Sequence, residues 1–249
     1  MIRYRNPYII LFAGLIMLLS AWPVRADEVL SASPYWQGFT SPDGQGLYHD
    51  LMRAIFEPGG HTVRHLEVPA KRGMIMVREG TVDIYTCRSE AESGLSLGKE
   101  PMYEGEFHAL FRKKDFPYWD GAAAMADKRV VWRLGYYSPM DFPVPVQHGE
   151  TTSGVEALER VVRGGADFYV DDLNLIRESV RLFQPPLDQD DFCIESVGFR
   201  QYFPVFSDSE RGQKLRLAYE QGMRTLAKQD KLASIYAKWN LPMPRTYKK

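Results

Sequence analysis

The amino-acid sequence predicts an α/β protein made of two lobes. After residue 26, segments with strand character alternate with segments whose apolar residues recur at helical spacing, which is typical of the α/β class. Two such sets follow one another. One long extended segment, 106–113, lies between the two sets, and another, 193–206, follows the second set. Because each extended segment can connect one set to the other, the sequence predicts two lobes joined by two crossing strands.

The first set has the order strand, helix, strand, helix, strand. Strands are expected at 29–32, 61–68 and 82–86, and helices at 47–55 and 71–79. The first helix carries an apolar stripe and is stopped by a Pro-Gly-Gly sequence, and a glycine ends the second helix. This order is the start of a parallel sheet.

The second set repeats the alternation of strands and helices. The elements expected here are strands at 130–134 and 168–170, helices at 155–162 and 173–180, and a small polar loop at 149–154. The polar loop precedes the first of these helices, and the second helix directly follows a strand. The second set therefore predicts another α/β lobe.

Two further helices, at 210–226 and 231–239, close the chain. If the second extended segment returns to the first lobe, these helices pack there. The expected division is one lobe made of 27–112 together with 203–249, and a second lobe made of 113–202.

Residues 1–26 have the layout of a secretory signal peptide. Arg3 and Arg5 form a positive start, residues 8–22 are apolar or small throughout, and Ala26 offers a small residue at the cleavage point. An apolar stretch of 15 residues is short for a membrane span. The alternative is an uncleaved N-terminal anchor.

Charge and composition exclude several kinds of partner. Without residues 1–26 the chain keeps 28 basic and 32 acidic side chains, a net charge of −4. This mild negative balance gives no electrostatic basis for binding nucleic acid or an anionic membrane. A hydrophobic content of 45% is ordinary for a globular protein.

Histidine and cysteine spacing predicts no metal site, and the sequence points to no cofactor. His61 and His65 are four residues apart, but they fall in an expected strand, where that spacing does not bring side chains together. Export would permit a disulfide between Cys87 and Cys193. Two unpaired thiols are the expectation, because a bond between the lobes would hinder their movement.

Four stretches in the right order resemble one known family. They are DGQGLYHDL at 43–51, REGTVD at 78–83, VRGGADFYVD at 162–171 and KLASIYAKW at 231–239. Together they span nearly the whole chain after residue 26. The chain resembles the periplasmic solute-binding proteins of the amino-acid type, known as family 3 of that class.

This resemblance implies a fold of two hinged lobes with a ligand cleft between them. It implies a periplasmic monomer that binds a small polar solute, such as an amino acid, by lobe closure. A ligand would stabilise the closed form in proportion to its preference for that form. The implied partner is a membrane transporter of the ABC type, which receives the solute from the closed form.

The loop within 80–103 is expected to hold the ligand, because ligands of α/β proteins bind beyond the carboxyl ends of strands. In the family, an arginine in this loop clamps the ligand's carboxylate, since guanidinium and carboxylate pair bidentately. In this chain the corresponding place falls near Glu92, which is not an arginine. Arg88 could replace it; alternatively, Arg88 pairs with Glu90 or Glu92 at the surface.

Other expected ligand-binding residues lie beside strands or at the start of a helix. Tyr35 and Trp36 follow the first strand, where an aromatic face would cover the ligand; the alternative is packing against the loop 39–46. Thr86 ends the third strand of the first set. Thr151 and Thr152 would offer hydroxyls and helix N-terminal amides to an anion, or would serve only to cap that helix.

Asp172 is the last expected ligand-binding residue. It follows a strand next to Asp171, and it would either bind a ligand ammonium or cap the helix that begins at Leu173. An enzyme on the same scaffold, similar to a dehydratase, is the alternative function and would need a cleft carboxyl with a shifted pKa. A soluble sensor that acts on a membrane receptor is a further alternative. No Ser-His-Asp or Cys-His arrangement is evident, so we expect no enzyme.

Overall fold

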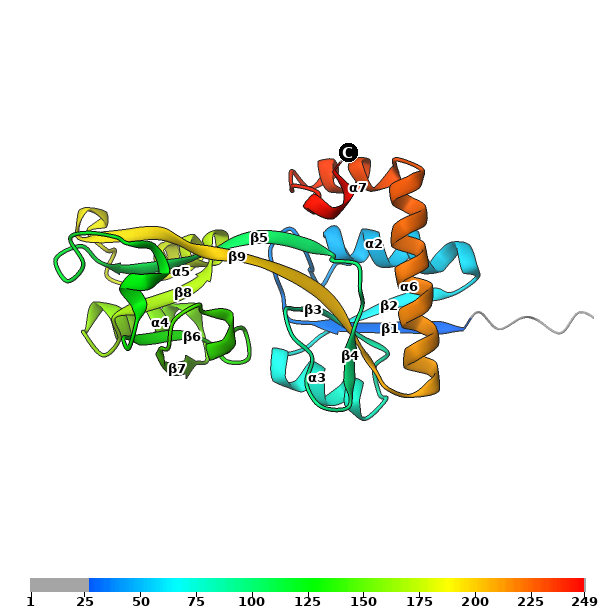
Figure 1. Cartoon of the computed structure of the whole chain (residues 1–249), viewed down its shortest axis with the longest axis horizontal. Coiled ribbons are helices and arrows are strands. Elements are labelled where there is room, and N and C mark those ends of the chain that lie inside the picture. Colours follow the sequence, from blue (N-terminus) through cyan, green and yellow to red (C-terminus); the bar gives the residue numbers. More distant parts are fainter. Residues whose placement is uncertain (1–26, 249) are drawn as a thin grey trace, which may run out of the picture.

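The computed structural model describes residues 27–248, which form two lobes joined by two long strands (Figure 1). The joining strands are β5 (Tyr103–Arg112) and β9 (Phe192–Ser207), which run side by side from one lobe into the other. The two-lobed α/β fold with two crossing strands is therefore confirmed. The signal peptide predicted at 1–26 lies outside the described residues.

The first lobe has a parallel sheet covered on both faces. Its elements are β1 (Glu28–Ser33), α2 (Leu47–Phe56), η1 (Glu57–Gly59), β2 (Thr62–Glu67), α3 (Ala70–Arg78), β3 (Ile84–Arg88), β4 (Leu95–Leu97), α6 (Glu210–Lys228), α7 (Lys231–Lys238) and η5 (Arg245–Tyr247). Neighbouring strand residues Ile84 and Tyr85 belong to different hydrophobic clusters, since side chains alternate between the faces of a strand. Helices α2, α6 and α7 cover one face, and α3 covers the other.

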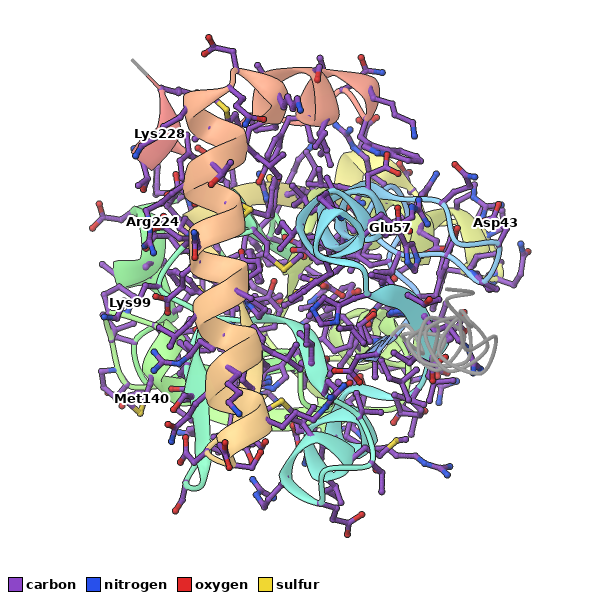
Figure 2. The ribbon with its side chains drawn as sticks, turned by 90° about the vertical axis from the view of Figure 1, so that its right-hand side faces the viewer. Asp43, Glu57, Lys99, Met140, Arg224 and Lys228 are labelled. Carbon is purple, nitrogen blue, oxygen red and sulfur yellow. The ribbon has the colours of Figure 1, made fainter. Side chains whose placement is uncertain are left out.

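The last two helices pack on the first lobe, as expected if β9 returns there. Helix α6 places Leu215, Tyr219 and Met223 in the core at helical spacing, against α2. Figure 2 looks along the molecule onto this lobe. Helix α6 lies in front, and the side chains of Arg224 and Lys228 are labelled beside it. No helix within residues 27–248 combines the length and the apolar character that crossing a membrane requires.

The second lobe repeats the architecture with a smaller parallel sheet. Its elements are η2 (Gly121–Met125), β6 (Arg129–Arg133), η3 (Pro139–Asp141), β7 (Gln147–Thr151), α4 (Gly154–Val162), β8 (Phe168–Asp172), α5 (Leu173–Leu182) and η4 (Gln189–Asp191). Val131 packs with α4 on one face, and Trp132 packs with Phe142 on the other. The strand order across both lobes is β2-β1-β3-β9-β5-β8-β6-β7.

Two short strands were not expected. The polar loop predicted at 149–154 is wrong in its first half, because β7 pairs in parallel with β6 from Gln147 to Thr151. The loop after β3 contains β4, which pairs with β9. Both strands are short and one is polar, so main-chain hydrogen bonds to a neighbouring strand define them rather than apolar alternation.

The crossing strands are shared between the lobes. From Phe107 to Leu110, β5 pairs with β8 of the second lobe, while the end of β9 pairs with β3 of the first lobe. These residues of β5 thus lie in the sheet of the second lobe. The division of the chain into two lobes at 112/113 and 202/203 stays a prediction.

A buried histidine makes the stability of the first lobe sensitive to acid. His65 lies in β2 with its ring nitrogens beside the hydroxyls of Ser31 (2.9 Å) and Ser33 (3.2 Å), and its ring meets that of His49 edge-on. Burial, and then the proximity of His49, lower the pKa of His65 to about 3. The folded state therefore holds this ring neutral.

We expect the free energy of unfolding to fall by about 1 to 2 kcal/mol between pH 7.5 and pH 5 because of His65 alone. The unfolded chain binds a proton near pH 6.5 and the folded chain does not, so stability is full above that pH and is lost as the pH falls toward 3. Urea unfolding at the two pH values, with His65→Gln as the comparison, measures the effect. An equal pH dependence in the two proteins would contradict it.

Candidate functional site

The carboxyl ends of strands from both lobes meet around one cavity. About 30 Å³ of it can hold the centre of a water molecule, and the empty space around this, part of it open to solvent, is about 450 Å³. The first lobe contributes Trp36, Tyr48 and Cys87 to its wall, and the second lobe contributes Tyr136 and Asp172. Because β1, β3, β6 and β8 all end here, the cavity occupies the place where α/β proteins bind ligands.

Direct bonds across the cleft hold the lobes against each other. Lys71 of α3 forms an ion pair with Glu150 of β7, with 2.7 Å between Nζ and Oε2. Ser89, just after β3, donates to Asp141 of η3 over 3.0 Å. These contacts join residues of different lobes, so the structure is a closed arrangement.

Asp172 lies at the end of β8 and faces this cavity. Its side chain forms no capping hydrogen bond to α5, although the residue occupies the N-cap position, so the capping alternative is wrong. The hydroxyl of Tyr202 donates to Asp172 Oδ1 over 3.3 Å. Burial, and then the neighbouring Asp171, raise the pKa of Asp172 to about 7, while Arg200 acts in the opposite direction. Asp172 is therefore a carboxyl that changes charge easily near neutral pH.

Asp171 has a structural role behind the cavity. It is fully buried, and its Oδ2 lies 2.8 Å from Nε of Arg133 and accepts a hydrogen bond from Tyr169. Burial raises the pKa of Asp171, and Arg133 counteracts this rise. The two adjacent aspartates thus differ, because one is paired with an arginine and the other lines the cavity.

Arg200 is a cavity residue that the sequence analysis missed. Its guanidinium lies 4.3 Å from the ring centre of Tyr137 and 5.0 Å from that of Tyr202. It donates to Ser89 over 2.6 Å and forms an ion pair with Asp141 at 3.1 Å. Arg200 is the only cation of β9, and this was the one signal in the sequence that could have singled it out.

Arg88 spans the two lobes beside the cavity. Its Nη1 donates to the carbonyl oxygen of Gly135 over 2.6 Å, and its Nη2 lies 3.9 Å from Glu92. Arg88 is thus near Glu92, as one alternative held, but its shorter contact is with the other lobe. It does not belong to the cavity wall described above.

Replacing Arg88 with alanine is expected to weaken solute binding about tenfold, because a hydrogen bond that exists only between closed lobes is lost. Isothermal titration with the best solute from a screen measures this change. Arg72→Ala, which removes an exposed arginine of α3 in the same lobe, is the matched control. Equal affinity of the Arg88 variant and the control would contradict the prediction.

The aromatic residues after β1 have different surroundings. Trp36 is buried, lines the cavity and stacks on Phe39 with 3.8 Å between ring centres, so it makes both contacts that the sequence suggested. Tyr35 is 41% exposed and does not belong to the wall. Thr86 is buried in β3 behind the wall, and its hydroxyl has no hydrogen-bond partner among the described residues.

Thr151 and Thr152 are not brought to the cavity. Thr151 is buried, and its hydroxyl lies within hydrogen-bond distance of the carbonyl oxygens of Trp132 (3.2 Å) and Ser153 (3.0 Å). Thr152 donates to Glu156 from its amide and its hydroxyl, both over 2.9 Å, while Ser153 caps α4. The loop of the second lobe that does reach the cavity follows β6 and carries Gly135, Tyr136 and Tyr137.

Both cysteines are free in the structure. Cys87 lies in a bulge of β3 on the cavity wall, and Cys193 lies in β9 opposite Phe111. Burial raises the pKa of Cys87 to about 12, so its thiol is protonated at neutral pH. Within residues 27–248, no group of three or more His, Cys, Asp or Glu side chains is placed to hold a metal ion.

Comparison with known proteins gives matches in structure alone. No protein-family model and no curated protein sequence matches this chain. A mutant of ArgBP from T. maritima matches with a TM-score of 0.63 and 17% identity, over 85% of this chain and 94% of that one. A substrate-binding protein of an ABC uptake transporter from Streptococcus pneumoniae with bound histidine also scores 0.63 with 17% identity, over 85% and 92%.

A histidine kinase sensor domain with similarity to periplasmic binding proteins matches with a TM-score of 0.65 and 18% identity, over 88% of this chain and 98% of that domain. These matches confirm the fold inferred from the four sequence stretches: the chain has the two-lobed fold of the periplasmic binding proteins. The three matched structures are binding proteins or a sensor domain rather than enzymes.

Proposed function

We propose that this chain binds a small polar solute between its lobes in the periplasm and delivers it to an ABC transporter. The observation that carries the proposal is a cavity whose wall combines residues of both lobes with two buried ionisable groups, Asp172 and Arg200. A solute in this place contacts both lobes and therefore favours the closed form. The protein acts as a monomer, without cofactor, metal or nucleic acid.

The proposed binding residues differ in the support that the geometry gives them. Trp36 and Asp172 line the cavity, and Arg88 and Thr86 lie next to it. We assign Tyr35 at most to the solvent-exposed side of a solute, because it is 41% exposed and is not part of the wall. For Thr151 and Thr152, the remaining role is to fix the start of α4 in the second lobe.

A thermal-shift screen of the chain 27–249 against amino acids, polyamines, sugars and organic acids tests the proposal. A solute that binds only the folded state must raise the melting temperature. We expect at least one class to do so, with micromolar affinity in calorimetry, which corresponds to about −8 kcal/mol. If no solute of any class shifts the melting temperature, the proposal fails.

A sensor is the second candidate, and the similarity to a kinase sensor domain favours it. Both candidates bind a solute by closure, and they differ in the membrane protein that recognises the closed form. Cross-linking of the solute-loaded protein to membranes of its source cells, followed by identification of the partner, separates a permease from a receptor.

An enzyme on this scaffold would use Asp172 as its acid or base, since the pKa of this carboxyl is raised to about 7. We propose binding without turnover, in keeping with the matched binding proteins. Following the identified solute by NMR in the presence of the protein tests this point. Conversion that Asp172→Asn abolishes would establish the enzyme instead.

A further inference from the structure

We propose that the solute of this cavity is a small carboxylic acid without an amino group, of the hydroxy-acid or keto-acid type, held by aromatic N–H and O–H donors. This inference rests on the function proposed above and names the ligand class of the same cavity. It follows from the hydrogen-bonding groups that the wall leaves unused.

Three donors on the wall have no hydrogen-bond partner among the described residues. They are Nε1 of Trp36 and the hydroxyls of Tyr48 and Tyr137, on side chains that are 6%, 1% and 5% exposed. A buried polar group without a partner destabilises the fold, so native proteins nearly always satisfy it with protein, water or ligand. Three unsatisfied donors around one cavity therefore point to an occupant rich in acceptor atoms.

The neighbours of these donors satisfy them only in part. The thiol of Cys87 lies beside the Tyr48 hydroxyl, and sulfur is a weak acceptor. The Tyr137 hydroxyl lies near that of Tyr202, which donates to Asp172 and can accept from Tyr137 at the same time. The indole N–H of Trp36 can only donate, so only an acceptor can satisfy it.

Most acceptors of the same wall are already engaged. The carbonyl oxygens of Pro34, Gly135 and Tyr136 accept from Thr40 (2.8 Å), Arg88 (2.6 Å) and Arg200 (3.3 Å). Asp172 accepts from Tyr202 at Oδ1, which leaves Oδ2 as its other acceptor. An ammonium group brings three donors and would need three free acceptors, which is more than this one carboxylate oxygen supplies. The wall therefore suits the oxygen atoms of an acid better than the ammonium of an amino acid.

Asp172 gives this ligand class a characteristic pH dependence. A carboxylate placed beside Asp172 favours the neutral form of the aspartate, because like charges repel. Since the pKa of Asp172 is raised to about 7 by burial and by Asp171, binding takes up a proton at neutral pH. An ammonium ligand would require the charged form and give the opposite dependence.

Several groups with a charge or a titratable proton lie close to Asp172, and two more, Arg177 of α5 and His108 of β5, line a second cavity that Asp172 also borders. The groups close to Asp172 are Asp171 of β8, Arg133 of β6, Tyr136 and Tyr137 of the following loop, Arg200 and Tyr202 of β9, Tyr103 of β5 and Cys87 of β3. The tyrosine and cysteine groups have raised pKa values and stay neutral below pH 8, and Arg133 and Arg200 stay charged. Between pH 6 and 8, the close groups that can change charge are therefore Asp172 and its neighbour Asp171, whose pKa burial also raises. Loss of the pH dependence in Asp172→Asn assigns it to Asp172.

The test compares matched pairs of solutes on the chain 27–249: lactate with alanine, malate with aspartate, and 2-oxoglutarate with glutamate. We expect one or more acids to raise the melting temperature and the paired amino acid to leave it unchanged. In calorimetry, the affinity for that acid should rise about tenfold from pH 8 to pH 6, as the protonated fraction of Asp172 rises.

Variants test the donors and the carboxyl separately. Tyr48→Phe and Tyr137→Phe should each weaken acid binding about tenfold, while Tyr118→Phe, at an 89% exposed tyrosine, should leave it unchanged. If a tyrosine variant fails to fold, Asp172→Asn still tests the inference. This variant carries no charge at that position, so acid binding at pH 8 should match that of the wild type at pH 6.

The outcomes also separate this inference from the function on which it rests. Binding of an amino acid but not of its paired acid, or of only sugars or polyamines, overturns the ligand class and leaves solute binding intact. Affinity for an acid that falls from pH 8 to pH 6 overturns the inference too. Absence of binding by every solute overturns both the inference and the proposed function.

Discussion

Replacing Arg200 with methionine is expected to lower the free energy of unfolding by about 3 to 5 kcal/mol. Arg200 and Asp141 form an ion pair with side chains that are only 7% and 8% exposed. Without the guanidinium, the carboxyl group of Asp141 stays in a buried place with only neutral hydrogen-bond donors such as Ser89. Removing one partner of a buried pair costs far more than the pair itself contributes.

Urea unfolding followed by tryptophan fluorescence measures this loss. Arg163→Met is the control, because Arg163 is 77% exposed and pairs with Glu159 on the surface of α4, where the expected change is below about 0.5 kcal/mol. The double variant Arg200→Met with Asp141→Asn should recover part of the stability, since no unpaired charge remains. A loss in Arg200→Met no larger than in Arg163→Met would refute this account.

Replacing Arg133 with methionine is expected to destabilise the protein by about 3 kcal/mol or more at pH 7.5, and by less at pH 5. Burial raises the pKa of Asp171, and Arg133 is the largest influence that lowers it. In the variant the pKa rises further, so the folded chain holds Asp171 protonated. A carboxyl group whose pKa is higher in the folded than in the unfolded chain stabilises the fold fully at a pH below its pKa in the unfolded chain. This stabilisation is lost as the pH rises through its pKa in the folded chain.

The measurement is the difference in unfolding free energy between Arg133→Met and the wild type at each of the two pH values. Taking the difference cancels the effect of His65, which is common to both proteins. Arg163→Met again serves as the control and should show the same small difference at both pH values. A difference for Arg133→Met that grows toward pH 5 would show that Asp171 is not the group left unpaired.

The fold could be predicted from local patterns, because each helix carries its own apolar stripe and each buried strand its own apolar run. Helix α4, for example, follows from the spacing of Leu158 and Val161 and from the glycines after it. Strand β7 could not be found in this way, since its residues are polar and its pairing with β6 defines it.

Residues of the candidate site could be predicted only where their position at the end of a strand brings them to the cavity. Trp36 and Asp172 follow strand ends, and the cavity forms at those ends. Arg200 stands out only as the single cation of β9, and its contact could not be predicted, because its partner Ser89 lies 111 residues away in the chain. Thr151 and Thr152 were predicted to bind a ligand, because hydroxyl groups before a helix can either bind an anion or cap the helix. In the structure they form hydrogen bonds at the start of α4.

The position of β9 between β3 and β5 determines the order in which this molecule can assemble. Until the segment from Phe192 onward is available, β3 and β5 each have an open edge, and the sheet of the first lobe has no link to that of the second. Unpaired strand edges are the part of a chain most prone to associate with other chains. A chain cut short before β9 should therefore aggregate, and the complete molecule depends on a strand that any vectorial process, synthesis or export, delivers late.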